Sequence, residues 1–204
     1  MKKNLSDLVY DGVVQDIVKG KFQSESVLNE KDLIQKYGVS RSPIREALAR
    51  LCNDGVLINL PRFGYKVRPI DKEYLDQIIQ LRLVLEVSYF DSYFASFTEG
   101  DLLHLEKSIP TLSGDMVKTP IDFWQLTSGF HLSLAECYQD RYFYETLKRV
   151  LNNQLLTFSA YYWSSWSKVV TGKMEDQHSY ILRAIRKKDK ETAIFLLRED
   201  IKSF

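Results

Sequence analysis

The sequence predicts a mainly α-helical protein with two domains: an amino-terminal winged helix-turn-helix over residues 1–70 and an all-helical antiparallel bundle over residues 71–204. Three observations lead to this prediction. A short helical pattern, a turn with a glycine and a longer helical pattern follow one another early in the chain. A hairpin pattern of two apolar runs comes directly after them. Beyond Pro69 the apolar residues recur at helical spacing, and no convincing pair of strand patterns is found.

The composition is that of an ordinary globular protein. Hydrophobic residues make up 45% and charged residues 27% of the 204 residues, which excludes a disordered or fibrous chain. No run approaches the roughly 20 apolar residues of a membrane span, and the first residues lack the apolar segment of a signal peptide, so we expect a cytoplasmic protein with no membrane partner. Cys52 and Cys137 stand far apart and predict neither a disulfide framework nor a cysteine zinc site.

The first third of the chain contains three helical patterns. Residues 4–19 place apolar side chains at helical spacing and end near Gly20. Residues 30–37 form a short second pattern, residues 38–40 interrupt it with a glycine, and residues 41–53 form a longer third pattern. This succession is typical of a helix-turn-helix.

A β-hairpin pattern follows the third helix. Residues 56–60 read as a strand, residues 61–64 as a tight turn and residues 65–68 as the returning strand. We interpret this hairpin as the wing. Pro69 ends the second strand, and the boundary between the two domains is therefore predicted near residue 70.

The rest of the chain is predicted to be helical throughout. Asp189 starts the last helix as a cap, and the basic residues 186–188 suit the end of the preceding one, so these two helices should form an antiparallel hairpin. The predicted helices lie near residues 72–79, 80–97, 99–110, 120–138, 140–166, 172–187 and 189–203.

The third helix of the first domain has two contrasting faces. At about 100° per residue its core face is formed by Ile44, Ala47, Leu48 and Leu51. The other face presents Arg41, Ser42 and Arg45 in the first turns, where a recognition helix enters the major groove. Residues 1–70 hold 12 Lys or Arg and 8 Asp or Glu, a basic balance that suits a polyanionic partner.

Three basic residues of this domain have specific expected roles. Arginine offers a planar fork that matches guanine O6 and N7, and Arg45 is the first candidate for a base contact. Lys31 and Arg62 are expected to contact phosphates or the minor groove. Glu46 faces the same side as Arg45 but repels phosphate, so we expect it to pair with a neighbouring arginine.

A known family shares this pattern of residues. Residues 39–48 (Val-Ser-Arg-Ser-Pro-Ile-Arg-Glu-Ala-Leu), followed by Leu51, Gly55 and the turn at residues 62–64, resemble the GntR family of bacterial repressors. The resemblance implies a homodimer that binds a short palindrome of double-stranded DNA. The predicted DNA contacts are Lys31, Arg41, Ser42, Pro43, Arg45, Arg62 and Gly64.

The helical domain resembles the FadR-like branch of that family, whose ligand domain is called FCD. The residues that carry this resemblance are Leu81 to Glu86, Phe130, His131, His178, Ile181, Leu182, Ala184 and Ile185. Many members of this branch bind a divalent metal through one aspartate and three histidines. His131 and His178 match two of these positions, whereas Thr127 replaces the aspartate and Asp200 replaces the third histidine.

The ligand set that remains still suits a metal. His131, His178 and Asp200 supply two nitrogens and one carboxylate, which can hold zinc, nickel or manganese and leave positions open for a ligand. Thr127 could reach the site only as a weak neutral ligand or through water. The alternative is that both histidines are hydrogen-bonded residues of a pocket without metal.

Polar residues near the same helices are candidates for binding an effector. Arg82, Arg149, Asn153 and Gln154 could orient an organic carboxylate or another polar ligand inside the bundle. Residues 155–166 are rich in aromatic side chains, which favour the core or a dimer interface over ligand contacts.

These patterns predict a transcriptional repressor rather than an enzyme. We expect a small metabolite in the helical domain to favour a dimer geometry in which the two recognition helices no longer match successive turns of DNA. Two alternatives remain open at this stage. One is a constitutive DNA-binding dimer whose helical domain only dimerises. The other is a metal-dependent enzyme built on His131, His178 and Asp200.

Overall fold

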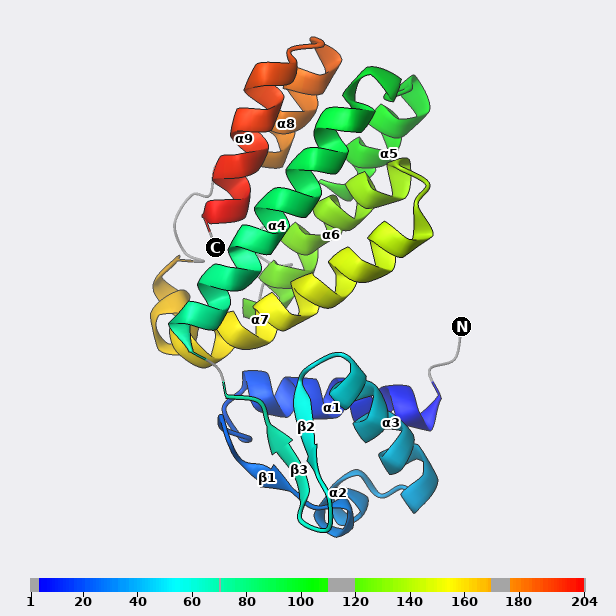
Figure 1. The fold of residues 1–204 in the computed structure, drawn as a ribbon, viewed down its shortest axis with the longest axis vertical. Helices are drawn as coiled ribbons and strands as arrows, with labels where there is room; N and C mark the ends of the chain where they lie inside the picture. The colour runs from blue at the N-terminus through cyan, green and yellow to red at the C-terminus, as the bar shows by residue number, and fades with distance from the viewer. Residues whose placement is uncertain (1–3, 70, 110–119, 170–176, 204) are drawn as a thin grey trace. The chain divides into compact units, whose positions relative to one another are not determined.

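The computed structural model describes residues 4–69, 71–109, 120–169 and 177–203. Its contacts divide the chain into two compact units, one centred on the amino-terminal elements and one on the helices that follow (Figure 1). The mainly helical fold class is confirmed, while the boundary near residue 70 stays a prediction. None of the described helices combines the length and the apolar character that crossing a membrane would require.

The first unit contains three helices and a three-stranded antiparallel sheet with the strand order β1-β3-β2. Helix α2 ends at Gly38, whose φ of 64° lets its N–H donate back to the Ile34 carbonyl and turn the chain toward α3. The two-residue strand β1 was not predicted, because two residues show no alternation. The elements are α1 (Leu5–Val18), β1 (Val27–Leu28), α2 (Glu30–Tyr37), α3 (Arg41–Asn53), β2 (Leu57–Leu60) and β3 (Gly64–Val67).

The core face of α3 is as predicted. Ile44, Ala47, Leu48 and Leu51 are each fully buried. Their burial fixes the rotation of α3, because a helix with one apolar stripe turns that stripe inward. The opposite face is left exposed.

The wing turn depends on backbone conformations that only certain residues accept. Strands β2 and β3 pair in register from Leu57 opposite Val67 to Leu60 opposite Gly64. In the turn, Arg62 has a φ of 72° and Gly64 a φ of 118°. A Cβ added at Gly64 would lie 2.6 Å from the carbonyl oxygen of Leu28, so glycine is required there.

The second unit is a bundle of helices, and one predicted division in it is wrong. Residues 72–79 and 80–97 were expected to be separate helices, but Lys72–Tyr93 is one helix, α4. Neither glycine nor proline interrupts the chain there, and a short 3₁₀ turn at Phe94–Ser96 follows it. The other helices are α5 (Glu99–Ser108), α6 (Pro120–Cys137), α7 (Arg141–Val169), α8 (Gln177–Arg186) and α9 (Lys190–Lys202).

The core of this bundle lies among α4, α5, α6, α8 and α9. The predicted hairpin of the last two helices is present, with Asp189 accepting a hydrogen bond from the Thr192 N–H at the start of α9. The buried side chains that form the core include Leu83, Val87, Phe90, Leu102, Leu105, Phe130, Leu134, Ile181, Leu182, Ile185, Leu197 and Ile201.

One buried carboxylate ties α1 to α2 in the first unit. The Asp16 side chain accepts a hydrogen bond from the Tyr37 hydroxyl at 2.7 Å and pairs with Lys36 Nζ at 2.6 Å and Lys21 Nζ at 3.1 Å. Burial alone would raise the pKa of Asp16, but its bonds to Lys36, Tyr37 and Lys21 lower the pKa below its ordinary value.

We expect Asp16→Asn to lower the local unfolding free energy of α1 by about 1–3 kcal/mol at neutral pH, because a charged acceptor is lost. Since the folded pKa is depressed, this stability is present above the unfolded pKa of 3.8 and disappears as the pH falls through the folded value. Amide hydrogen exchange of α1 measures the effect. Asp32→Asn is the control, because Asp32 is exposed on α2 and makes no ion pair with the described residues. Equal protection in the two variants would contradict the prediction.

Candidate functional site

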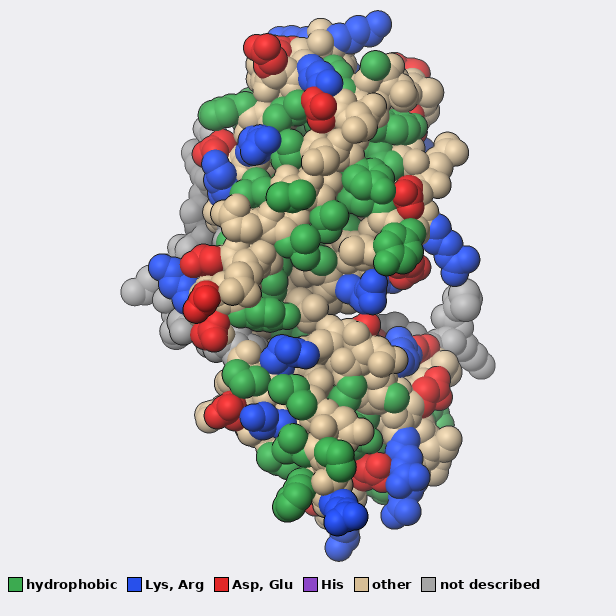
Figure 2. All heavy atoms as spheres, viewed as in Figure 1, with side chains coloured by type: hydrophobic (Ala, Val, Ile, Leu, Met, Phe, Trp, Pro, Cys, Tyr) green, Lys and Arg blue, Asp and Glu red, His purple; other side chains and the backbone are tan. Residues whose placement is uncertain are grey.

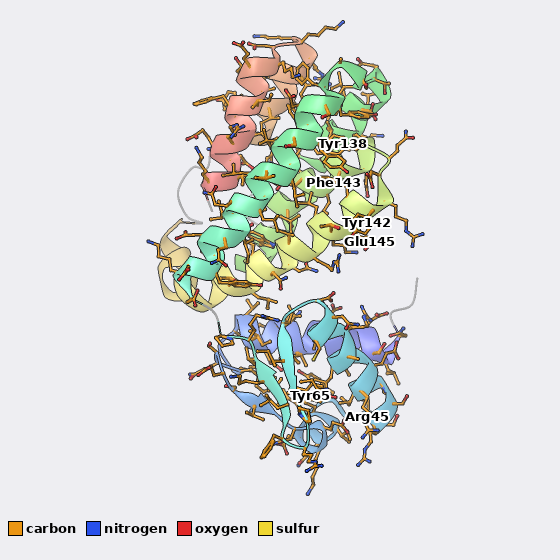
Figure 3. All side chains as sticks on the ribbon, in the orientation of Figure 1. Arg45, Tyr65, Tyr138, Tyr142, Phe143 and Glu145 are labelled. Atoms are coloured by element: carbon orange, nitrogen blue, oxygen red, sulfur yellow. The ribbon has the colours of Figure 1, made fainter. Side chains whose placement is uncertain are left out.

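The start of α3 presents the basic residues that the sequence singled out. Arg41, Ser42 and Arg45 are exposed, and Pro43 is half-buried between them. Figure 3 labels Arg45 on α3 beside Tyr65 of β3. In the same view, Figure 2 shows Lys and Arg side chains gathered at the end of the first unit where α2, α3 and the wing turn meet.

The partner of these arginines is not the one that the sequence predicted. Arg45 Nε donates to both carboxylate oxygens of Glu30, at 2.9 and 3.0 Å. Arg41 Nε lies 3.8 Å from the same carboxylate. Glu46 is exposed and makes no ion pair with the described residues, so its expected pairing is wrong. Glu30 takes this role because the first turn of α2 lies against the first turns of α3.

The wing turn and α2 border the same surface. Lys31 is exposed in the first turn of α2, and Arg62 is exposed in the wing turn. The wing turn approaches the start of α2, since a Cβ at Gly64 would be 3.1 Å from Asn29 Oδ1. The structure thus brings Lys31, Gly64 and the start of α3 to neighbouring places.

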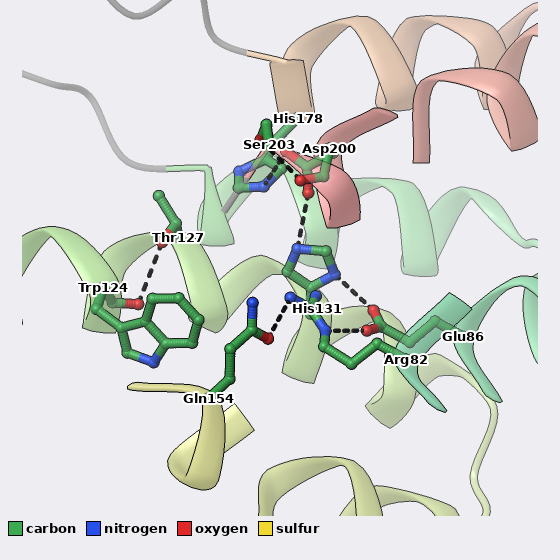
Figure 4. A network of polar contacts seen from close by, with 9 residues as sticks. All are labelled: Arg82, Glu86, Trp124, Thr127, His131, Gln154, His178, Asp200 and Ser203. Carbon is green, nitrogen blue, oxygen red and sulfur yellow. Dashed lines mark hydrogen bonds and ion pairs between the residues drawn. The ribbon is translucent and has the colours of Figure 1, made fainter. Parts of the chain in front are cut away.

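A second candidate site is a cluster of buried polar side chains inside the bundle (Figure 4). The cluster draws on five helices that are distant in sequence, α4, α6, α7, α8 and α9. No member has more than 5% of its surface exposed. The six residues are Arg82, Glu86, His131, Gln154, His178 and Asp200.

Glu86 holds the centre of this cluster. Arg82 Nε donates to one of its oxygens at 2.6 Å, and His131 Nδ1 donates to the other at 2.6 Å. Arg82 Nη1 also donates to Gln154 Oε1 at 2.9 Å. Burial would raise the pKa of Glu86, but the neighbouring Arg82 and His131 outweigh it and lower the pKa to about 2. Glu86 is therefore a carboxylate at neutral pH.

Three potential metal-ligand atoms converge, one each from His131, His178 and Asp200. His131 Nε2, His178 Nε2 and an oxygen of Asp200 lie within 4.8 Å of one another. His131 Nε2 is 2.9 Å from Asp200 Oδ2, and His178 Nε2 is 3.4 Å from Asp200 Oδ1. Despite these distances, His131 Nε2, His178 Nε2 and Asp200 Oδ2 have no partner in acceptable hydrogen-bond geometry within the part of the chain that the structure describes.

This donor set fits a divalent cation. Buried polar atoms without a hydrogen-bond partner are rare, and one cation would satisfy all three. The hydrogen bond from His131 Nδ1 to Glu86 leaves Nε2 as the metal-binding nitrogen, the usual arrangement of a histidine ligand. The His178 ring stacks on Phe130 with the ring centres 4.3 Å apart, which orients the second nitrogen. Two nitrogens and one carboxylate suit zinc, nickel or manganese.

Without a cation the cluster can balance its charges internally. Burial lowers the pKa of His131, but the Glu86 carboxylate and the contact with Asp200 raise it overall above the ordinary value. Burial also opposes the ionisation of Asp200, yet His131 and His178 hold its pKa well below the usual range. The positive charges of Arg82 and a protonated His131 would then balance the negative charges of Glu86 and Asp200.

The other residues predicted to bind a ligand, Thr127, Arg149 and Asn153, differ in burial. Thr127 is buried on α6, and its hydroxyl donates to the Trp124 carbonyl of its own helix at 3.2 Å. Arg149 is exposed on α7, so the structure does not bring it into the cluster. Asn153 is half-buried next to Gln154. The side chains of the aromatic residues 158–166 lie outside the described residues.

Glu86 is the residue that sequence reasoning missed as a site residue. A signal for it was present, because Arg82 and Glu86 are four residues apart in an otherwise apolar stretch. An isolated pair of opposite charges at this spacing meets on one helix face, and here that face is buried.

Comparison with known proteins finds one family match for each part of the chain. Residues 5–67 match the family described as "Bacterial regulatory proteins, gntR family". Residues 77–203 match the family described as "FCD domain". Together the two matches cover most of the chain, and both families occur in transcriptional regulators rather than enzymes.

Individual relatives resemble the chain over most of its length. The "Uncharacterized HTH-type transcriptional regulator YdhC" of Bacillus subtilis (strain 168) is 28% identical over 187 residues, 90% of this chain and 82% of its own. The "Gluconate operon transcriptional repressor" of Bacillus licheniformis is 24% identical over 202 residues, 90% of this chain and 76% of its own. The solved structure "E. coli McbR/YncC" covers 99% of this chain and 95% of its own with a TM-score of 0.74 and 21% identity, which shows the fold alone.

We expect Arg82→Met to lower the unfolding free energy of the helical unit by about 3 kcal/mol, because it leaves a buried carboxylate without its guanidinium partner. Urea unfolding followed by circular dichroism measures the loss. Arg149→Met removes the same charge from an exposed site on α7 and should change stability by no more than about 0.5 kcal/mol. Similar losses in the two variants would show that Arg82 is not a structural partner of Glu86.

Proposed function

The chain belongs to the GntR family of bacterial transcriptional regulators and carries an FCD domain, and on this premise we propose that it is a homodimeric repressor released from its operator by a small metabolite. The prediction that the chain is a DNA-binding regulator and not an enzyme is confirmed by its family. The palindromic operator, the dimer and the ligand response belong to this proposal, as does its place in the cytoplasm, where a chromosomal operator is found.

The exposed face of α3 is the observation that best supports the operator contact. Arg41, Ser42 and Arg45 lie in its first turns, where the amide groups of the helix start add partial positive charge. Arg45 can present a bidentate fork to guanine. Lys31 and Arg62 border this face and would bind phosphates, which position the protein without reading sequence.

Helix α4 supports the dimer and its coupling to a ligand. Leu81 and Val84 are 46% and 64% exposed on its outer face, an unfavourable state for aliphatic side chains in water. A second copy of the chain would cover them and supply the two-fold symmetry of a palindrome. The inner face of the same helix carries Arg82 and Glu86, so a ligand that moves this pair also moves the dimer contact.

The buried cluster supports a carboxylate effector beside a divalent metal. His131, His178 and Asp200 would hold the metal, whose chemistry here is to offer open coordination positions to an anionic ligand. Arg82 Nη2 and Gln154 Nε2 are buried donors that find no acceptor among the described residues. An anion with two oxygens would satisfy such donors, which favours an organic carboxylate over a neutral ligand.

We expect Arg45→Ala to weaken binding to a selected operator duplex by about 10- to 100-fold, because one bidentate base contact is worth about 1–3 kcal/mol. Operator duplexes are first selected from a randomised library with the wild-type protein, and fluorescence anisotropy then gives the affinity. Arg198→Ala is the control, since Arg198 is exposed on α9 of the other unit. Unchanged affinity and salt dependence in Arg45→Ala would contradict the proposed DNA face.

We expect the purified protein to bind one zinc, nickel or manganese ion per chain, and His131→Ala or His178→Ala to abolish this binding because each removes a ligand. Glu86→Gln should weaken the affinity about 10- to 100-fold, since the carboxylate fixes the tautomer of His131. Titration calorimetry and elemental analysis measure both effects. His104→Ala is the control, because His104 is exposed and, among the described residues, pairs with Glu136 away from the cluster.

The same metal titration also tests the alternative of a cluster without metal. A protein that binds none of these metals at neutral pH would have a metal-free cluster with a protonated His131. The effector is then sought by repeating the operator titration with a panel of organic carboxylates. Linkage requires that a true effector shift the midpoint of the operator titration. An operator affinity that no compound changes would favour the constitutive dimer.

A further inference from the structure

Glu30 is a half-buried carboxylate placed among exposed arginines. Its side chain is 24% exposed, whereas those of Arg45 and Arg41 are 60% and 68% exposed. It accepts from Arg45 Nε with both oxygens, at 2.9 and 3.0 Å. It is the first residue of α2, directly after Asn29.

The geometry at Arg45 leaves one edge of the guanidinium available. A guanidinium carries five N–H groups, one on Nε and four on the two Nη atoms. Glu30 binds the Nε, and no described residue accepts a hydrogen bond from the Nη atoms of Arg45. The Nη1–Nη2 edge is one of the two edges with which arginine can form parallel bonds to guanine O6 and N7.

We propose that Glu30 is a positioning residue for DNA recognition, which holds Arg45 by its Nε so that the Nη1–Nη2 edge is presented to a base. This inference rests on the proposed contact between Arg45 and DNA. An arginine that is oriented before binding loses less side-chain freedom when it meets its base. Glu30 thus lowers the entropic cost of the contact.

The negative charge of Glu30 also disfavours binding to DNA of non-cognate sequence. A carboxylate near the phosphate backbone is repelled by it, whatever the sequence. On the cognate sequence the bonds of Arg45 to guanine offset this repulsion. On other sequences these bonds do not form, and the repulsion is not offset. Removing the charge should therefore strengthen binding to arbitrary DNA and weaken the preference for guanine.

A structural role alone does not account for the contact. Ion pairs at exposed sites contribute at most about 1 kcal/mol to stability. The fold of α3 depends instead on its buried face, where Ile44 and Leu48 are fully buried. We therefore expect Glu30→Gln to keep the melting temperature of the wild type.

The matched control for Glu30 lies two residues further along the same helix. Asp32 is also in the first turn of α2, carries the same charge, is exposed and makes no ion pair with the described residues. Asp32→Asn and Glu30→Gln each remove one negative charge from the same turn. Only Glu30→Gln removes the carboxylate that holds Arg45.

The experiment uses the full chain and a library of short duplexes with a randomised centre. Selection and sequencing give the base preference at each position for the wild type, Arg45→Ala, Glu30→Gln and Asp32→Asn. Fluorescence anisotropy gives the affinity of each protein for one duplex of arbitrary sequence. Positions at which Arg45→Ala erases a guanine preference are assigned to Arg45.

We expect Glu30→Gln to reduce the guanine preference at the Arg45 positions about 5- to 10-fold, part of the discrimination that one bidentate contact supplies. Its affinity for arbitrary DNA should rise about 2- to 5-fold, because one repulsive charge is lost. Asp32→Asn should show the rise in affinity without the loss of preference.

The possible failures are distinguishable. If Arg45→Ala erases a guanine preference and Glu30→Gln keeps it, the positioning role of Glu30 is overturned while the DNA face stands. If Asp32→Asn loses the preference as Glu30→Gln does, the effect is one of charge alone and the positioning role is again overturned. If Arg45→Ala keeps every wild-type preference, the proposed base contact of Arg45 itself is wrong.

Discussion

The carboxylate of Glu86 lies inside the helical bundle with a guanidinium on one oxygen and an imidazole on the other. A buried carboxylate is costly unless both oxygens are bonded to positive or donating groups, and here both are. Because Glu86 accepts from Nδ1 of His131, the other ring nitrogen is directed toward Asp200 and His178. The orientation of the candidate metal site thus follows from one residue that is not itself a candidate ligand.

This arrangement places the site on the helix that would also carry the dimer contact. Glu86 and Arg82 occupy the inner face of α4, while Leu81 and Val84 occupy its outer face. A ligand that draws on Arg82 must shift the helix or strain the pair, because packed interiors deform little. Helix α4 is therefore the element through which a change at the buried cluster could reach the symmetry of the assembly.

The two candidate sites share one arrangement of side chains, at the surface in one unit and in the core of the other. In each, a carboxylate binds one side of a cationic or ring group and leaves another side available: Glu30 with Arg45 at the surface, and Glu86 with His131 in the core. At the surface the pair contributes little to stability and acts on specificity. In the core the same arrangement is a condition of folding, since an unpaired charge there would cost several kcal/mol.

The sequence by itself determined the order of the first three helices and the wing hairpin, the inward face of α3 and the set of basic residues around it. These follow from local periodicity, caps and turn residues, which act over a few neighbours and can be read along the chain. The sequence also indicated His131, His178 and Asp200 as one group, although only through resemblance to a family. The predicted division between residues 79 and 80 is wrong, because nothing in this part of the sequence interrupts the helix that runs from Lys72 to Tyr93.

Only the tertiary structure decided which charges meet. Glu30 and not Glu46 pairs with Arg45, because the partner comes from a preceding helix that the turn at Gly38 folds against α3. Gln154 joins Arg82 across 72 positions of sequence, and Arg149 stays outside although it is nearer in sequence to Arg82. Pairing of side chains depends on how helices pack, and packing combines contacts from distant parts of the chain that no local pattern records.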